Sequence, residues 1–295
     1  MRTKLLSWIV LCGVAALMAV SAQAQEGRVA GRIVAAKVKG TVTAVNTADN
    51  SKHELHDNDA ITQNYVVTTS LNSSVILVFS NGATINLAQD STLVIEQFLQ
   101  DPFSTSYAMA TATDEPSTSV TKLNLARGEL VGNVKHLHKE GPNASSFSVN
   151  TPVGAAGIRG TTFRIVFRPD SSGKAFFTLS TAEGEVILTG TTAVNTNVPT
   201  GQEVTVTVEV NVDAKTGVVT VTAPPTVVTQ DIPAATQATI AKAAQEIVTT
   251  NTAVIFTSAT TNTNTTPPVT PPVTPPVTPP VQTPPSQTTS GDGKT

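Results

Sequence analysis

The chain is poor in cysteine, in aromatic side chains and in charge. Its 295 residues include one cysteine, Cys12, and the aromatic and charged fractions are 4% and 13%. Cys12 lies in the apolar N-terminal run, so a chain cleaved after that run has no disulfide, thiol nucleophile or thiolate metal ligand. The formal net charge of −3, without long runs of one sign, gives no electrostatic signature of nucleic-acid or anionic-membrane binding. Stability must therefore come from burial of a core.

Residues 1–24 have the pattern of a secretory signal peptide. Two basic residues precede an apolar run from 5 to 20, and an Ala-x-Ala pattern ends at Ala24. The run is shorter than the ~20 apolar residues that a transmembrane helix needs. We therefore predict cleavage before Gln25 and export to a periplasm or to the cell surface, with no membrane span in the cleaved chain.

Threonine, valine and alanine dominate the rest of the chain, and the excess of β-branched residues favours strands. Between residues 28 and 225, short apolar runs alternate with turn residues. Three hairpins follow from this pattern. They join 75–79 to 83–87 across Asn81-Gly82, 163–167 to 175–179, and 204–212 to 218–221.

Other segments of residues 28–225 give weaker signals. Residues 100–121 lack periodicity and contain two prolines, which predicts a long loop. The apolar residues on either side of Gly128, from 123 to 137, predict a strand, a glycine turn and a second strand. Residues 91–98 predict a strand whose two faces are too mixed to show which one is buried.

The most distinctive stretch runs from Phe147 to Phe163. It opens as an alternating strand that breaks at Thr151-Pro152, because proline lacks a backbone donor and favours extended geometry before it. Three glycines follow, and each can take a positive φ or let another backbone approach. The strand pattern resumes at Thr161. We therefore predict a strand, a glycine-rich corner and a second strand.

This stretch resembles the signature of FecR-like domains, which carry Thr-Pro, a run of small residues and then Gly-Ile-Arg-Gly-Thr-Phe. One extra threonine precedes the final phenylalanine here. The matching positions are Thr151, Pro152, Gly154, Gly157, Ile158, Arg159, Gly160, Thr161 and Phe163. Flanking strand and turn units extend the resemblance over about residues 29–208.

The resemblance implies an all-β domain of short stacked strands, similar to a β-solenoid, with a β-sandwich as the alternative. The family's type protein is an inner-membrane regulator that relays an outer-membrane transporter signal to a cytoplasmic sigma factor. We find no match to its cytoplasmic segment ahead of residue 29 or to its transporter-binding region after residue 208. We therefore carry over the fold and an extracytoplasmic interaction role.

Residues 231–250 predict an amphipathic helix, because Pro233 precedes an alanine-rich run and Lys242 and Glu246 are spaced to pair. Its apolar stripe consists of Ile240, Ala244, Ile247 and Val248. Such a helix is marginal alone, so we expect it to dock on the β domain or on a partner. Residues 257–295 contain repeated Thr-Pro-Pro-Val and predict a disordered, Thr/Pro-rich tail.

Candidate chemical residues are few. Arg159 either is a solvated corner side chain or bonds carbonyls or a carboxylate and locks the glycine corner, and we favour the lock. The glycines lack the following helix and the lysine of a phosphate-binding loop. The histidine and carboxylate groups lack a third ligand fixed by spacing, which predicts no metal and no cofactor. These groups are His53, His56, Asp57 and Asp59, and separately His136 and His138.

The sequence also argues against an enzyme. Glu129, Glu183 and Glu185 sit beside or near glycines at strand ends, where we expect solvated carboxylates, and no Gly-x-Ser-x-Gly elbow occurs. We therefore expect an exported, non-enzymatic FecR-like module that binds an unidentified envelope or surface protein, with a role in signalling. The alternative is a structural or adhesive component that binds glycan through the β domain, held on the proline-rich tail.

Overall fold

The computed structural model describes residues 27–141, 143–170, 173–190, 195–212, 219–260 and 262–264. The predicted signal peptide and residues 265–295 of the predicted tail lie outside the described residues. The strands are β1 (Val29–Ala30), β2 (Ile33–Lys39), β3 (Val42–Asn46), β4 (Lys52–Glu54), β5 (Asp59–Ile61), β6 (Tyr65–Thr69), β7 (Ser74–Phe79), β8 (Thr84–Leu87), β9 (Ser91–Gln100), β10 (Tyr107–Ala108), β11 (Ser119–Asn133), β12 (Ser146–Thr151), β13 (Gly154–Pro169), β14 (Lys174–Gly190), β15 (Asn195–Pro199), β16 (Gln202–Val212), β17 (Val219–Val221), β18 (Thr226–Asp231), β19 (Val254–Phe256) and β20 (Asn262–Asn264).

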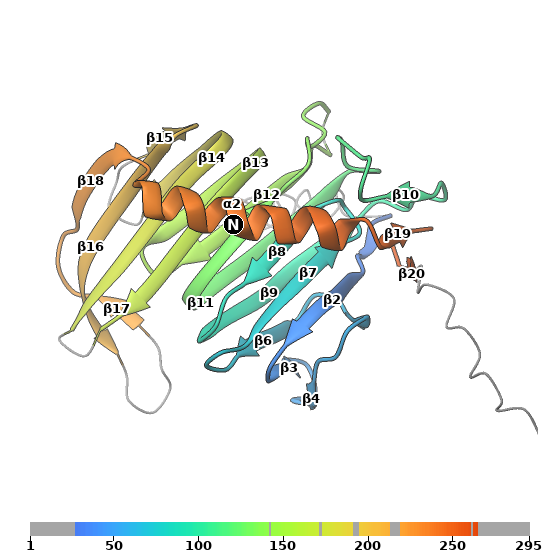
Figure 1. Ribbon diagram of the computed structural model, residues 1–295, viewed down its shortest axis with the longest axis horizontal. Coiled ribbons are helices and arrows are strands. Elements are labelled where there is room, and N and C mark those ends of the chain that lie inside the picture. The colour runs from blue at the N-terminus through green and yellow to red at the C-terminus, as the bar shows by residue number, and fades with distance from the viewer. Residues whose placement is uncertain are drawn as a thin grey trace, which may run out of the picture. The chain divides into compact units, whose positions relative to one another are not determined.

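These strands confirm the all-β prediction, and Ala234–Asn251 form the helix α2. Most strands belong to one mixed sheet that folds into two layers around a shared apolar core (Figure 1). We call the layer beneath α2 the helix-side layer and the other the far layer. The helix-side layer runs β5-β2-β7-β8-β11-β13-β14-β16-β18, and the far layer runs β4-β3-β6-β9-β11-β12-β13-β14-β15. The chain passes repeatedly between the layers, as in a solenoid.

Three long strands, β11, β13 and β14, run through both layers and bend where they cross. In β13 and β14 the bends lie at Gly160 and Gly184, whose φ angles are +62° and +76°. The two backbones approach so closely that a Cβ on Gly184 would lie 2.6 Å from the carbonyl oxygen of Gly160. Glycine is required at Gly184 both by this contact and by the left-handed conformation.

These crossings correct two predictions. Residues 123–137 do not form a strand, turn and strand, because β11 continues from Ser119 to Asn133 and only bends at Gly128. Nor does the strand of the motif resume at Thr161. After a tight turn at Pro152 and Val153, β13 begins at Gly154. A glycine inside a continuous strand and a glycine in a turn give the same sequence signal.

The mixed faces of residues 91–98 have a physical cause. In β9, Leu93 and Ile95 face the core, then Glu96 is exposed and Phe98 is buried. The pairing with β11 shifts at this point, with Ile95 opposite Leu123 and Gln97 opposite Lys122. Glu96 is therefore a β-bulge residue, and the inserted residue moves the buried face from odd to even positions.

The three predicted hairpins are confirmed. Strand β7 pairs with β8, β13 with β14, and β16 with β17. The turn at 213–217 lies outside the described residues. The predicted loop 100–121 needs correction, because Tyr107–Ala108 pair with β19 and residues 119–121 belong to β11.

The helix packs on the outer face of the helix-side layer, as predicted. Ile240 and Ile247 form a buried cluster with Val131 and Ile232. The helix begins later than predicted, at Ala234. Strands β10, β19 and β20 form a separate small sheet, so residues 254–260 and 262–264 are structured where the tail was predicted to begin at 257. In the part of the chain that the structure describes, no helix is long and apolar enough to cross a membrane.

Candidate functional site

An open groove lies between α2 and the helix-side layer, with a volume of about 430 Å³. We call it the helix groove. One wall is apolar and the other is mostly polar. The apolar wall comes chiefly from Ile232, Ile240, Ala241, Ala244, Ile247 and Val248, and the polar residues are Asn133, Thr162, Glu183 and Gln237. Size and composition are typical of a ligand or peptide site, in which apolar walls surround a few polar groups.

The polar wall is a row of hydrogen bonds across three strands. Asn133 Nδ2 on β11 donates to Thr162 Oγ1 on β13 at 3.0 Å, and Thr162 Oγ1 donates to Glu183 Oε2 on β14 at 2.7 Å. Glu183 is the one ionisable side chain among the residues that line the groove. The row therefore holds a single carboxylate against an otherwise neutral wall.

The groove is open because the helix contacts the sheet through a narrower stripe than its sequence predicts. Ile240 and Ile247 are buried, but the side of the helix that carries Val248 faces solvent and Val248 is 65% exposed. The expected pairing of Glu246 with Lys242 is not formed among the described residues; Glu246 Oε2 instead accepts a hydrogen bond from Asn86 Nδ2 at 3.2 Å.

A second groove, of about 360 Å³, flanks the opposite side of α2. We call it the lysine groove, because Lys37, Lys39 and Lys242 line it. Its two carboxylates are engaged: Glu246 contacts Asn86, and Glu129 Oε1 accepts from Arg164 Nε at 2.7 Å. No described residue forms a hydrogen bond or an ion pair with the ammonium groups of the three lysines. The groove therefore presents positive charge in a chain whose net charge is negative.

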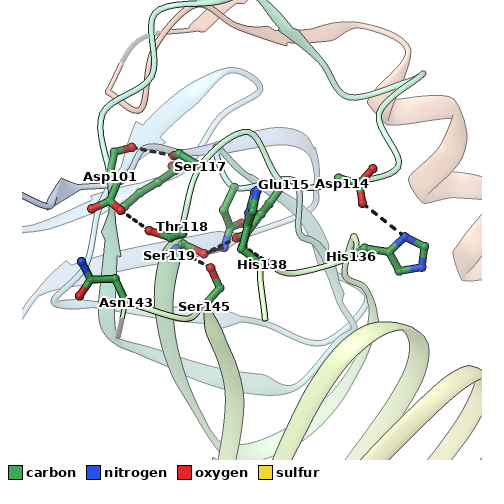
Figure 2. Close-up of polar contacts among 12 residues, drawn as sticks. Asp101, Asp114, Glu115, Ser117, Thr118, Ser119, His136, His138, Asn143 and Ser145 are labelled. Carbon is green, nitrogen blue, oxygen red and sulfur yellow. Dashed lines mark hydrogen bonds and ion pairs between the residues drawn. The ribbon is translucent and has the colours of Figure 1, made fainter. Parts of the chain in front are cut away.

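A third feature is a polar cluster between the loop 101–118 and the segment after β11 (Figure 2). At its centre lies Glu115, whose side chain is fully buried. Glu115 Oε1 accepts the backbone N–H of His138 at 2.7 Å and lies 2.9 Å from His138 Nδ1, while Oε2 accepts from Ser119 Oγ at 2.8 Å. Burial is tolerated because each oxygen has a partner.

Arg28, near the start of the described chain, also belongs to the cluster. Arg28 Nε lies 3.3 Å from Asp101 Oδ1, and Asp101 also accepts a hydrogen bond from the Thr118 hydroxyl. Ser119 N donates to Ser145 Oγ at 2.9 Å. Within the same loop, burial and the nearby carboxylates of Glu115 and Asp114 raise the pKa of Tyr107, whose hydroxyl donates to the Asp114 carbonyl at 2.7 Å.

The geometry of this cluster serves to attach the loop 101–118 to the sheet and does not match a nucleophile site. In a catalytic triad an imidazole lies between the serine and the carboxylate. Here the carboxylate of Glu115 lies between Ser119 and His138, so the imidazole of His138 does not face the serine oxygen. The contacts tie the loop to the start of β11 and to the segment that follows β11. These contacts were not predictable from the sequence, because Glu115 lies in a polar stretch without periodicity.

The predicted histidine groups lie apart from one another. His56 Nδ1 lies 3.5 Å from Asp59, His53 packs edge-on against Tyr65, and His136 Nδ1 lies 3.6 Å from Asp114. Because His136 and His138 have different carboxylate partners, they do not act as a pair. Across the described ranges, no three His, Cys, Asp or Glu side chains are grouped so that they could hold a metal ion.

The motif residues support the layered core. Ile158 and Phe163 are buried in it, and Thr151 Oγ1 donates to the Gly154 carbonyl at 3.0 Å across the turn. A Cβ on Gly154 would lie 2.7 Å from the carbonyl oxygen of Thr189, whereas one on Gly157 would make an ordinary contact.

Arg159 and Thr161 occupy contrasting positions at the crossing. Arg159 is exposed opposite Glu185, and its guanidinium forms no hydrogen bond or ion pair with the described residues, so the expected lock is not seen. Thr161 is buried, and its hydroxyl has no described partner. Close glycine packing, and not a guanidinium, fixes the bend.

Comparison with known proteins gives one family match. Residues 65–187 match the family model described as FecR protein. Two crystal structures of a putative anti-sigma factor from Parabacteroides distasonis are similar at 11% identity, with TM-scores of 0.36 and 0.35. Each alignment covers 56% of this chain and 59% of the other, so this chain spans less than two thirds of those proteins. No curated protein matches.

The family match lies within the range that the sequence motifs indicate, and it includes the crossing strands β11, β13 and the first part of β14. The predicted resemblance is thereby confirmed over its central part. Residues 65–187 of this chain form a FecR domain.

Proposed function

We propose that this protein is an exported, non-enzymatic FecR-domain module that binds another envelope protein through the helix groove, as a step in signalling. The signal-peptide pattern of residues 1–24 supports export. The groove carries the binding part of the proposal, because it combines an apolar wall with one fixed carboxylate.

The groove favours a partner segment of defined chemistry. Apolar side chains would cover the wall around the half-buried Ala244 and the exposed Val248. A lysine or arginine on the same segment would face Glu183, and that pairing would select its register. The partner is therefore an apolar segment that carries one basic side chain.

Photo-crosslinking in the exporting cell tests this proposal. A benzoylphenylalanine at Val248 should capture one discrete protein, and Glu183→Lys should abolish the product by placing like charges together. Glu185→Lys, two residues along the same strand, is the matched control. A probe at Leu71, which is 72% exposed in the turn between β6 and β7, gives the background. Equal products at both probe positions would contradict the proposal. N-terminal sequencing of the exported chain should begin at Gln25.

The lysine groove favours a second candidate function, in which the β domain binds an acidic glycan and the proline-rich tail acts as a stalk. Lys37, Lys39 and Lys242 converge there with the amide side chains of Asn72 and Gln89. Retention on immobilised polygalacturonate, lost in Lys37→Gln/Lys39→Gln and kept in Lys174→Gln, would favour this function over the first.

A further inference from the structure

Strand β18 ends the helix-side layer with an open edge. It pairs with Gln202–Thr207 of β16 along one side, and all six of its residues are exposed. In Figure 1 it is the outermost strand at the left of the sheet, beyond β16. Among the described residues no strand pairs with its other side. Its outward backbone N–H and C=O groups are therefore available to another strand.

The edge lacks the features that usually protect such strands. Residues 226–231 contain no proline, lysine or arginine, and the pairing with β16 shows no bulge. Val227 and Val228 are 43% and 50% exposed. By contrast, β2 near the other end of the layer carries exposed Lys37 and Lys39. The sequence Thr-Val-Val-Thr-Gln is rich in residues that favour strands.

We propose that β18 is a self-association surface, on which β18 of a second copy pairs antiparallel about a two-fold axis at Val228. Val228 then lies opposite its own copy, Val227 opposite Thr229, and Thr226 opposite Gln230. Because a two-fold axis perpendicular to the sheet keeps inward faces on the same side, this pairing continues the helix-side layer into the second copy.

Charge and proline select this register. Centring the pair on Val227 would bring Pro225 into the ladder, and proline has no N–H to donate. Centring it on Thr229 would bring Asp231 opposite Val227. The register at Val228 pairs five uncharged residues and leaves the two Asp231 carboxylates at opposite ends. Five residue pairs form a small interface, so the association should be weak and dependent on concentration.

The proposal goes beyond the proposed function and does not depend on the helix groove. A dimer joined at β18 would present two helix grooves on one continuous layer, and a partner with two segments could bind both with increased avidity. Val248 lies fourteen residues, or about 21 Å, along α2 from its first residue, Ala234, which follows β18 closely in the chain, so Val248 and the edge of β18 can be altered separately.

A cysteine trap tests the register. In the full chain carrying Cys12→Ser, Val228→Cys should form a disulfide-linked dimer on mild oxidation, because directly opposite residues on paired strands lie within disulfide reach. Thr226→Cys is the matched control. In the proposed register its two copies are about 13 Å apart, four residues along the strand, and should not cross-link. Equal trapping at both positions, or none at Val228, would overturn the register.

Sedimentation measures association without a cross-link. The chain should dimerise as its concentration rises, and Val228→Lys should weaken dimerisation at least tenfold by placing two ammonium groups opposite each other. Val248→Lys makes the same change at an exposed position on α2 and should leave dimerisation unchanged. A chain that stays monomeric at every concentration, with no trapping at Val228, refutes self-association and leaves the edge open to another protein's strand.

Discussion

The layered core and the elements attached to it are held in different ways. At the crossing of β13 and β14, the backbones of the two strands are in close contact, and glycines such as Gly184 allow the bend. The helix α2 and the loop 101–118 are instead fastened by a few buried groups, chiefly Ile247 and Glu115. The core is therefore specified by sterics along whole strands, whereas each attachment depends on single side chains. The open surfaces beside α2 follow from that narrow fastening.

The crossing should be the most sensitive point of the chain. Gly184→Ala adds a Cβ 2.6 Å from the Gly160 carbonyl oxygen at a φ of +76°, so we expect a loss of about 4 kcal/mol in the free energy of unfolding. Gly201→Ala is the control, because Gly201 has a φ of +86° but nothing near its Cβ. That variant should lose about 1 kcal/mol. Equal losses in urea denaturation would show that the close contact contributes nothing.

Disruption of the loop attachment should cause the second-largest loss in the free energy of unfolding. Glu115→Ala removes the shared acceptor of the Ser119 hydroxyl and the His138 N–H groups, and we expect a loss of about 3 kcal/mol. Asp114→Asn alters the exposed neighbouring pair with His136 and should change stability by less than about 0.5 kcal/mol. In Glu115→Ala, backbone hydrogen exchange should be faster in residues 101–118 than it is in the unaltered chain. Acceleration spread evenly over the core would contradict a local fastening.

Disruption of the helix attachment should cause the third-largest loss in the free energy of unfolding. Ile247→Ala removes a side chain that is 1% exposed from a small cluster near the surface, which should cost about 2 kcal/mol. Val248→Ala, at the adjacent exposed position, should cost less than about 0.5 kcal/mol. Circular dichroism should show early melting of helix in the first variant alone. Similar melting curves would mean that the helix is not held through Ile247.

Sequence patterns predicted the local features of this fold well. Alternation and Asn-Gly located the β7–β8 hairpin, and the alanine-rich run located α2. These features depend on neighbouring residues, so a short window contains the information. The FecR motif also lay within the family match, although its glycines shape the bend and close contacts of β13 and not a separate corner.

The remaining features depend on residues far apart in the chain. Nothing near Gly128 distinguishes a bend within one strand from a turn between two. The helix groove needs the side of Val248 to stay open, which is decided by how Ile247 seats against Val131, more than a hundred residues earlier. Glu115 meets His138 only because β11 carries the chain out and back. Long-range packing therefore sets the candidate sites.

The crossing also contains a buried hydroxyl without a described partner. Its removal should give the smallest predicted change in stability, and this change should be a gain. Thr181 is fully buried beside the bend, and its hydroxyl has no partner among the described residues. Thr181→Val replaces that hydroxyl with a methyl group of similar size, so the folded state no longer bears the cost of an unpaired polar group, and stability should rise by about 1 kcal/mol.

Thr162→Val is the control on the neighbouring strand, where the hydroxyl bonds both Asn133 and Glu183, and it should lower stability by about 1 kcal/mol. The two melting temperatures should therefore move in opposite directions. If Thr181→Val also lowers the melting temperature, its hydroxyl has a partner such as a buried water, and steric fit alone does not hold the crossing together.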